Sequence, residues 1–182
     1  MDSNPKVGSA MTGAGHVCTA ICAGAAALTL MGQDPMSPPG ALAVALTVAG
    51  SLLPDVDTET SVAGRCLRPV SFTLAALGVA HRTLTHSLMA ALSVGAACWW
   101  LSSSGLGAYP WWFLGGFLLH LFLDSLSSQG VLWLWPAQRF LGSGPYRYKR
   151  GHHGVYRVGS AGEALMVVLF CGVCVILPAV CR

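Results

Sequence analysis

Charged residues are scarce in this sequence. Asp, Glu, Lys and Arg together make up 9% of the 182 residues, whereas soluble domains carry about 25%. Hydrophobic residues account for 54%. This composition argues against a soluble domain and predicts an integral membrane protein, and the length suits a single membrane domain over residues 1–182. No nucleic-acid partner is expected, and the composition indicates no particular oligomeric state.

Several familiar motifs are also absent. The N-terminus has no charged segment leading into an apolar core and a cleavage site, so we expect no removable signal peptide and a first apolar segment that stays as an anchor. The lack of HExxH argues against a zincin-type protease, and the lack of GxSxG argues against a serine esterase. The seven cysteines are odd in number and dispersed, which argues against a disulfide framework. Cys171 and Cys174 form a CxxC inside an apolar run, where both thiols are expected to act as small hydrophobic side chains.

Five apolar segments are candidates for membrane-spanning helices. They predict an all-α fold, a polytopic membrane bundle of about five transmembrane helices at residues 14–31, 39–53, 84–101, 109–126 and 161–178. A further apolar run at 70–80 is too short to span a bilayer. It is expected to form a re-entrant or interfacial helix, or to extend the third helix.

Basic residues are distributed unevenly between the loops. With five spans and a cytoplasmic N-terminus, nine of the ten Lys and Arg residues lie on the cytoplasmic side, as the positive-inside rule requires. We therefore expect a multi-pass membrane protein whose N-terminus is cytoplasmic. Residues 139–160 form a basic cytoplasmic loop, and its 147–157 portion is expected to attract anionic headgroups of membrane lipids. Binding of a phosphate-bearing substrate is the alternative role for His152 and His153 in this loop.

Histidines and acids from all five segments reach one predicted level, the inner membrane boundary, although the orientation was derived from Lys and Arg alone. Such groups are costly at a low-dielectric boundary unless they pair or bind a cation. The sequence therefore predicts a metal site there. Its candidate residues are His16, Asp55, Asp57, His81, His86, His120, Asp124 and Glu163.

Local spacing refines two parts of this cluster. His120 and Asp124 are four residues apart, so they share one helix face and can hold one ion together. The proline of LPDVD ends the second helix and leaves Asp55 and Asp57 in an extended turn. Alternate residues of such a turn point to opposite sides, so one of the two acids is expected to bind metal directly.

The histidines of HRTLTHS have a different spacing. His81 and His86 are five residues apart, which does not stack well on a helix. This segment is therefore expected to be a turn that enters the third helix, with Thr83 or Thr85 near the cap.

The types of ligand in this cluster indicate which metal it could bind and whether the site is catalytic. Imidazole favours zinc, iron or manganese, and carboxylates admit manganese and magnesium as well. A mixed His/Asp set without cysteine is typical of a catalytic site rather than of a closed structural zinc site. Eight candidates exceed the needs of one tetrahedral ion, so we expect one or two divalent ions, with zinc favoured.

The order of these motifs resembles a known family. His16, LLPDVD, HRTLTHS and HLFLDSLSSQGVLWLWP resemble, over roughly residues 11–165, the membrane-bound metal-dependent hydrolases (YdjM-like, called LexA-regulated in some bacteria). Ser127 stands where that family often has threonine. The resemblance implies the metal ligands His16, Asp55, His81, His86, His120 and Asp124, with Asp57 and Glu163 as additions. It also implies a protein of the bacterial cytoplasmic (inner) membrane.

Two functions remain in view at this point. The first is a metal-dependent hydrolase that cleaves a phosphoester of a lipid or lipid-linked substrate with metal-activated water, with a lipid amide, as in transmembrane ceramidases, as the rival substrate. Asp57 or Glu163 would take the proton from the water, and Arg82 would stabilise anionic charge. The second is non-enzymatic metal or proton transport or sensing. A transport pathway should place polar groups through the whole bilayer depth, but Asp34 is the sole acid on the outer side.

Overall fold

In the computed structural model, residues 12–137 and 154–181 are described. Helices dominate these residues, which contain no named strand, and Ser127 and Tyr156 form an isolated parallel bridge. The prediction of an all-α membrane bundle is confirmed. The elements are α1 (Gly13–Leu30), α2 (Pro38–Leu52), the 3-10 turn η1 (Leu53–Asp57), α3 (Val62–Cys66), α4 (Arg68–Ala76), α5 (Leu88–Leu101), the short π-turn η2 (Ser102–Leu106), α6 (Tyr109–Leu126) and α8 (Ala161–Val180).

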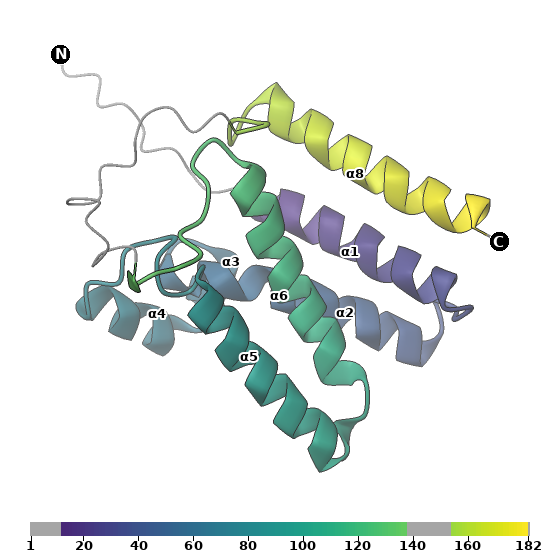
Figure 1. The fold of residues 1–182 in the computed structure, drawn as a ribbon, viewed down its shortest axis with the longest axis horizontal. Coiled ribbons are helices and arrows are strands. Elements are labelled where there is room, and N and C mark those ends of the chain that lie inside the picture. Colours follow the sequence, from purple (N-terminus) through teal and green to yellow (C-terminus); the bar gives the residue numbers. More distant parts are fainter. Residues whose placement is uncertain (1–11, 138–153, 182) are drawn as a thin grey trace.

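The long helices correspond to the five predicted spans. Within the described residues, three segments are long and apolar enough to cross a membrane, namely Gly13–Leu30, Pro38–Asp57 and Ala161–Val180. The other two predicted spans are α6, with 18 residues, and the shorter α5, with 14 residues. Helices that follow one another along the chain run in alternate directions, so the starts of α1, α5 and α8 and the ends of α2 and α6 lie toward one end of the bundle (Figure 1). We call this the site end.

Hydroxyl side chains begin most of these helices. Thr12, Ser37, Ser87 and Ser160 each accept a hydrogen bond from a backbone N–H in the first turn of α1, α2, α5 and α8, and this satisfies one of the donors that a helix start leaves free. The cap of α5 corrects the expectation of Thr83 or Thr85. The helix begins at Leu88, because the HRTLTH segment stays in turns and the Ser87 hydroxyl is the first that can cap it.

The apolar run at 70–80 does not extend α5. It contributes most of α4, a nine-residue helix that is separated from α5 by the turns carrying the HRTLTH motif. Helix α4 packs against α3 and η1. The predicted basic loop at 139–160 falls largely outside the described residues, and so do His152 and His153.

Helices α2 and α6 cross at very short distance. An added Cβ at Gly116 would collide with the backbone carbonyl of Thr47, and one at Gly50 would collide with the carbonyl of Phe113. Small residues at a crossing let two membrane helices bring their backbones together. This contact fixes the end of α2, and with it η1, against the last two turns of α6.

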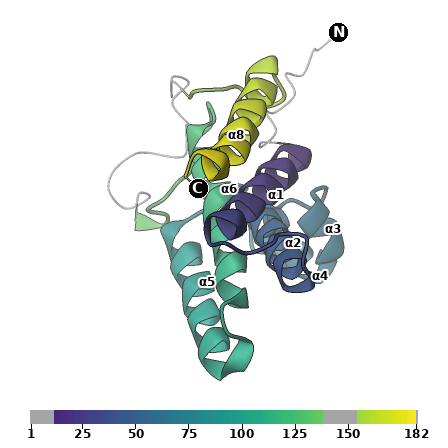
Figure 2. The ribbon, with the colours of Figure 1, turned by 90° about the vertical axis from the view of Figure 1, so that its right-hand side faces the viewer.

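Helix α8 completes the bundle by packing along α1, and the two lie side by side in both views (Figures 1 and 2). At the site end, Leu123 and Tyr156 form a buried cluster against Met166 and Phe170 of α8. The Tyr156 hydroxyl donates to the carbonyl of Leu123 at 2.8 Å, so the chain before α8 is tied to the end of α6.

Candidate metal centre

Most of the side chains nominated from the sequence meet at the site end of the bundle. They come from the first turn of α1, from η1, from the turns before α5 and from the last turns of α6. His16, His86, His120 and Asp124 are fully buried. Histidine rings and carboxylates buried together in a membrane bundle indicate a functional site, because each is costly to place there singly.

Four ligand atoms form a compact cage. His86 Nε2 and His120 Nε2 are 3.1 Å apart. Asp55 Oδ1 lies 3.6 Å from each of these nitrogens. Asp124 Oδ2 lies 3.7 Å from His86 Nε2 and 3.6 Å from His120 Nε2. Bonds of about 2.0 to 2.1 Å to a tetrahedral zinc ion place neighbouring ligand atoms about 3.3 Å apart, so these separations suit ligands of one small divalent cation.

The other ring nitrogen of each cage histidine is held by a hydrogen bond. His120 Nδ1 lies 2.6 Å from the Ser51 carbonyl oxygen, which can only accept. Nδ1 therefore carries the proton, and Nε2 presents its lone pair to the cage. Metal-bound histidines are commonly oriented in this way by a carbonyl or carboxylate behind them.

Thr85 fixes the tautomer of His86 through a hydrogen bond to its other ring nitrogen. Thr85 Oγ1 donates to Asp57 Oδ2 at 2.6 Å and lies 3.0 Å from His86 Nδ1. Because its proton is committed to Asp57, the hydroxyl accepts from His86 Nδ1–H. The chain His86–Thr85–Asp57 thus directs the Nε2 lone pair of His86 inward.

His16 extends the cage on the α1 side. Its ring stacks on that of His120, with centroids 3.8 Å apart and planes 13° apart. Its Nε2 lies 3.5 Å from Asp124 Oδ1. Among the described residues, three groups of ligand atoms are spaced to hold an ion, and together they contain all six predicted metal ligands: His86, His120 and Asp124; His16, Asp55 and His120; and Asp55, His81 and His86. The residues therefore accommodate one ion and offer ligands for a second.

Several buried polar atoms in this cluster make no hydrogen bond. On the cage side they are both ring nitrogens of His16, Oδ1 of Asp55 and both carboxylate oxygens of Asp124, and on the Arg82 side they are its Nε and Nη2. Leaving such atoms without hydrogen bonds costs free energy, and more so for charged groups. A divalent cation among them would offset this cost, so the donor set fits a metal ion.

Arg82 holds Asp124 from the other side. Its Nη2 lies 2.9 Å from Asp124 Oδ2, and its Nη1 donates to Ser127 Oγ at 2.9 Å and to the Gly130 carbonyl at 3.2 Å. The backbone of Arg82 has φ 64°, a left-handed conformation that is unusual for a residue with a side chain. The guanidinium is buried and contacts these partners through Nη1 and Nη2, and its Nε makes no hydrogen bond. Its expected role in stabilising anionic charge stays a prediction.

Asp57 and His81 form a pair at the edge of the cluster. Asp57 Oδ1 lies 2.7 Å from His81 Nδ1, and the His81 side chain is 31% exposed, so it marks the side on which the centre approaches the surface. Burial lowers the pKa of His81, but the hydrogen bond and charge of Asp57 outweigh it and leave the pKa above its usual value. The two acids of η1 therefore differ: Asp55 joins the cage, and Asp57 contacts His81 and Thr85.

Glu163 lies in a different setting. Its Oε1 accepts hydrogen bonds from Thr12 N at 2.8 Å and Thr12 Oγ1 at 2.9 Å, and its Oε2 accepts from Gly159 N at 2.6 Å. These bonds connect the start of α1 to the turn before α8. Among the described residues, the groups with metal-ligand spacing do not include Glu163, and its role as a proton acceptor stays a prediction.

Two supporting groups were not recognised from the sequence. Thr85 lies inside HRTLTHS, so its neighbour His86 was a signal that could have drawn attention to its hydroxyl. Ser51 contributes a backbone carbonyl, and any residue would supply that oxygen. Only the crossing of α2 and α6 reveals it.

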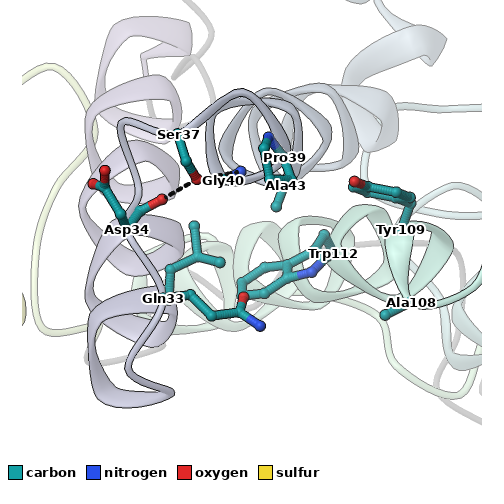
Figure 3. Close-up of a pocket in the computed structure, with 10 residues that line it drawn as sticks. Gln33, Asp34, Ser37, Pro39, Gly40, Ala43, Ala108, Tyr109 and Trp112 are labelled. Atoms are coloured by element: carbon teal, nitrogen blue, oxygen red, sulfur yellow. Dashed lines mark hydrogen bonds between the residues drawn. The ribbon is translucent and has the colours of Figure 1, made fainter.

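A separate cavity lies at the opposite end of the same helices. Its volume is about 590 Å³, and its lining includes Gln33, Asp34, Tyr109 and Trp112. Figure 3 shows the Asp34 carboxylate pointing away from the aromatic rings; the carbonyl of Asp34 accepts a hydrogen bond from Ser37 Oγ at 2.6 Å. With no histidine in its lining, this cavity lacks the donor set found at the site end.

The fold and the buried His/Asp cluster define an all-helical membrane protein with a possible metal centre at one end of its bundle. A family model described as YdjM inner membrane protein matches residues 11–181. The chain belongs to this family and is an inner membrane protein. Comparisons with curated proteins and with solved structures give no significant match.

Proposed function

We propose that this protein is a membrane-embedded metal-dependent hydrolase that cleaves a phosphoester of a lipid or lipid-linked substrate. The observation that carries the proposal is the cage formed by His86 Nε2, His120 Nε2 and the two carboxylates, with the histidine nitrogens 3.1 Å apart. A divalent ion bound there would lower the pKa of a bound water to about 7 and polarise the scissile group. Zinc suits the donor set best, and manganese, iron or magnesium are the alternatives.

The residues of the chain divide the remaining tasks. Asp55, His86, His120 and Asp124 hold the ion, and His16 supports them or takes part in a second site. The hydrogen bonds from Ser51 and Thr85 keep both imidazoles in the binding tautomer. Arg82 keeps the Asp124 carboxylate in place through its ion pair at 2.9 Å.

The pair at the edge of the cluster is suited to proton transfer. Asp57 Oδ1 orients His81 through Nδ1, and His81 is the partly exposed member of the cluster. A substrate that enters on this side meets His81 first. In this proposal, Asp57 assists removal of the proton from the attacking water through His81.

The location follows from the positive-inside bias. The N-terminus and the site end lie on the cytoplasmic side, where nine of the ten basic residues fall. Non-enzymatic transport is the rival function. It is disfavoured because the ionisable cluster is confined to one end of the helices, whereas a pathway needs polar groups through the bilayer.

The experiment uses full-length protein in lipid nanodiscs. Metal content is measured by elemental analysis, and hydrolysis is assayed on phospholipids, a polyprenyl phosphate and a ceramide. We expect metal-dependent release from a phosphoester, and loss of both metal and hydrolysis in His120→Ala and Asp124→Asn. Ser125→Ala is the control, because that hydroxyl donates to the Phe122 carbonyl of its own helix. Cleavage of the ceramide alone would show that the substrate is a lipid amide and not a phosphoester. Metal-driven uptake into vesicles without any hydrolysis would show that the protein is a transporter and not an enzyme.

A further inference from the structure

The segment between the two motifs of the site carries several exposed large apolar side chains although it forms only short helices. We call Val62, Leu67, Val70, Phe72 and Leu77 the apolar platform. All five are exposed, and Phe72 and Leu77 reach 69% and 73%. Soluble surfaces rarely gather large apolar side chains in this way, so the platform indicates a surface that something apolar covers.

Helix α4 is attached to the rest of the molecule by one face only. Ser71 is buried, and α4 packs on η1 and α3. Figure 1 shows α4 at the edge of the bundle, next to α3. Because η1 supplies Asp55 and Asp57, the platform stands directly on the element that carries two acids of the metal centre.

The platform also leads into the other motif of the site. The chain leaves α4, turns at Gly78 with φ 69° and reaches His81 four residues after Leu77. His81 is the side chain at which the cluster approaches the surface. The platform therefore lies, along the chain, between Asp57 and the partly exposed edge of the centre.

The positive charge of this segment indicates what kind of surface it contacts. Residues 62–80 contain Arg65 and Arg68 and no acid, and both arginines are exposed. Apolar side chains beside basic ones are typical of helices that lie in the headgroup region of an anionic membrane. A span is excluded, because nine residues of helix cover about 14 Å of a hydrocarbon core about 30 Å thick.

We propose that α3 and α4 form an interfacial anchor. The apolar platform inserts among the acyl chains of the surrounding leaflet, and Arg65 and Arg68 bind the phosphates of anionic lipid headgroups. A lipid held there presents its headgroup beside His81. This last step rests on the function proposed above and deepens it: the substrate reaches the centre from the bilayer and not from solution.

Lipid contact is tested directly by fluorescence. A single cysteine is placed at Phe72, Leu77 or the exposed Glu59 in a variant whose native cysteines are serine or alanine, and it is labelled with an environment-sensitive dye. The protein is reconstituted in phosphatidylethanolamine and phosphatidylglycerol with bromine on the acyl chains. We expect strong quenching at Phe72→Cys and Leu77→Cys and little at Glu59→Cys. Equal, weak quenching at all three would overturn the proposal, and a shielded dye without bromine quenching would mean that a protein covers the platform.

A second measurement needs no substitution, in case the cysteine-free chain fails to fold. The wild-type protein is reconstituted with phosphatidylglycerol that carries a photoreactive diazirine near the headgroup, and adducts are mapped by mass spectrometry. We expect adducts within residues 62–80. Adducts restricted to the long helices would contradict the interfacial anchor.

The delivery step is tested by comparing two substrates. Phe72→Asp with Leu77→Asp should lower hydrolysis of a long-chain phospholipid about tenfold or more, because the charges oppose insertion, while a short-chain soluble analogue is cleaved at the wild-type rate and the metal content is unchanged. An equal loss on both substrates would refute delivery through the platform. If the wild-type protein cleaves neither substrate, the proposed hydrolase fails, while the quenching result still decides the membrane anchor.

Discussion

His86 Nε2 and His120 Nε2 face each other at 3.1 Å inside the bundle. Each ring is held from behind, through the Ser51 carbonyl or the Thr85 hydroxyl, in a way that puts its proton on Nδ1. Two lone pairs at this separation repel unless a positive centre lies between them. The pair therefore behaves as half of a metal site whose other half is the two carboxylates.

The first prediction concerns the sharing of one ion. His86→Ala and His120→Ala should each remove as much metal as the double variant does, because either loss leaves the same ion with too few ligands. Elemental analysis and calorimetric titration with zinc check this. Losses that add up in the double variant would mean that the two histidines hold separate ions.

The second prediction concerns Thr85. Thr85→Val keeps the shape of the side chain but removes the hydroxyl that connects His86 Nδ1 to Asp57, so metal affinity should fall about 10- to 100-fold, as it does when partners behind other metal ligands are removed. Thr85→Ser, which keeps the hydroxyl, should restore most of the affinity. The absorption spectrum of the cobalt-substituted protein should shift in the valine variant alone. An unchanged affinity in Thr85→Val would remove the threonine from the site.

The long helices could be read from the sequence because apolar length is a local property. The span predicted at 109–126 coincides with α6, and the span predicted at 14–31 is displaced from α1 by one residue at each end. The start of α5 could not be read in the same way. An apolar residue at 84 looks like helix, yet the turns of HRTLTH and the cap at Ser87 delay the helix to Leu88.

The candidate site was predictable in membership but not in roles. The sequence places the acids and histidines at one predicted depth in the membrane, and this was enough to identify the members of the cluster. The free-energy cost of burying such groups at that depth does not depend on the direction of each side chain. The different positions of Asp55 and Asp57 depend on the 3-10 turn η1, in place of the extended turn expected. The role of the Ser51 carbonyl depends on how closely Gly50 and Gly116 let two helices approach, and no local pattern encodes that.

The third prediction concerns Arg82. In the metal-free protein, Arg82→Ala should lower the free energy of unfolding by about 3 to 5 kcal/mol, because removing one partner of a buried ion pair leaves the Asp124 carboxylate uncompensated. Arg82→Lys should recover only part of this, since an ammonium cannot reproduce the forked contacts to Asp124 and Ser127. Thermal and denaturant unfolding in detergent measure the loss. Arg68→Ala, at an exposed site, should stay within about 0.5 kcal/mol of the wild type, and equal stability of the two alanine variants would contradict the ion pair.

The fourth prediction separates two roles for Glu163. Glu163→Gln replaces one accepting oxygen with an amide that can only donate, so one of the bonds from Thr12 or Gly159 is lost and the protein should be destabilised by about 1 to 3 kcal/mol. If the residue serves only to connect α1 and α8, metal content and the rate per folded molecule should match the wild type. A stable variant with normal metal content but no hydrolysis would instead support the prediction that Glu163 accepts a proton.

The fifth prediction uses two adjacent glycines of α6. An added Cβ at Gly116 would meet the Thr47 carbonyl, whereas one at Gly115 meets nothing within 4 Å. Gly116→Ala should therefore push α2 from α6, cost about 1 to 3 kcal/mol of stability and weaken metal binding, because the Ser51 carbonyl moves away from His120 Nδ1. Gly115→Ala should leave metal binding unchanged and stability equal or slightly higher, since alanine favours helix over glycine. Unfolding and zinc titration of both variants decide the matter: if Gly116→Ala lost stability but bound zinc normally, the helix crossing would support the fold without orienting His120.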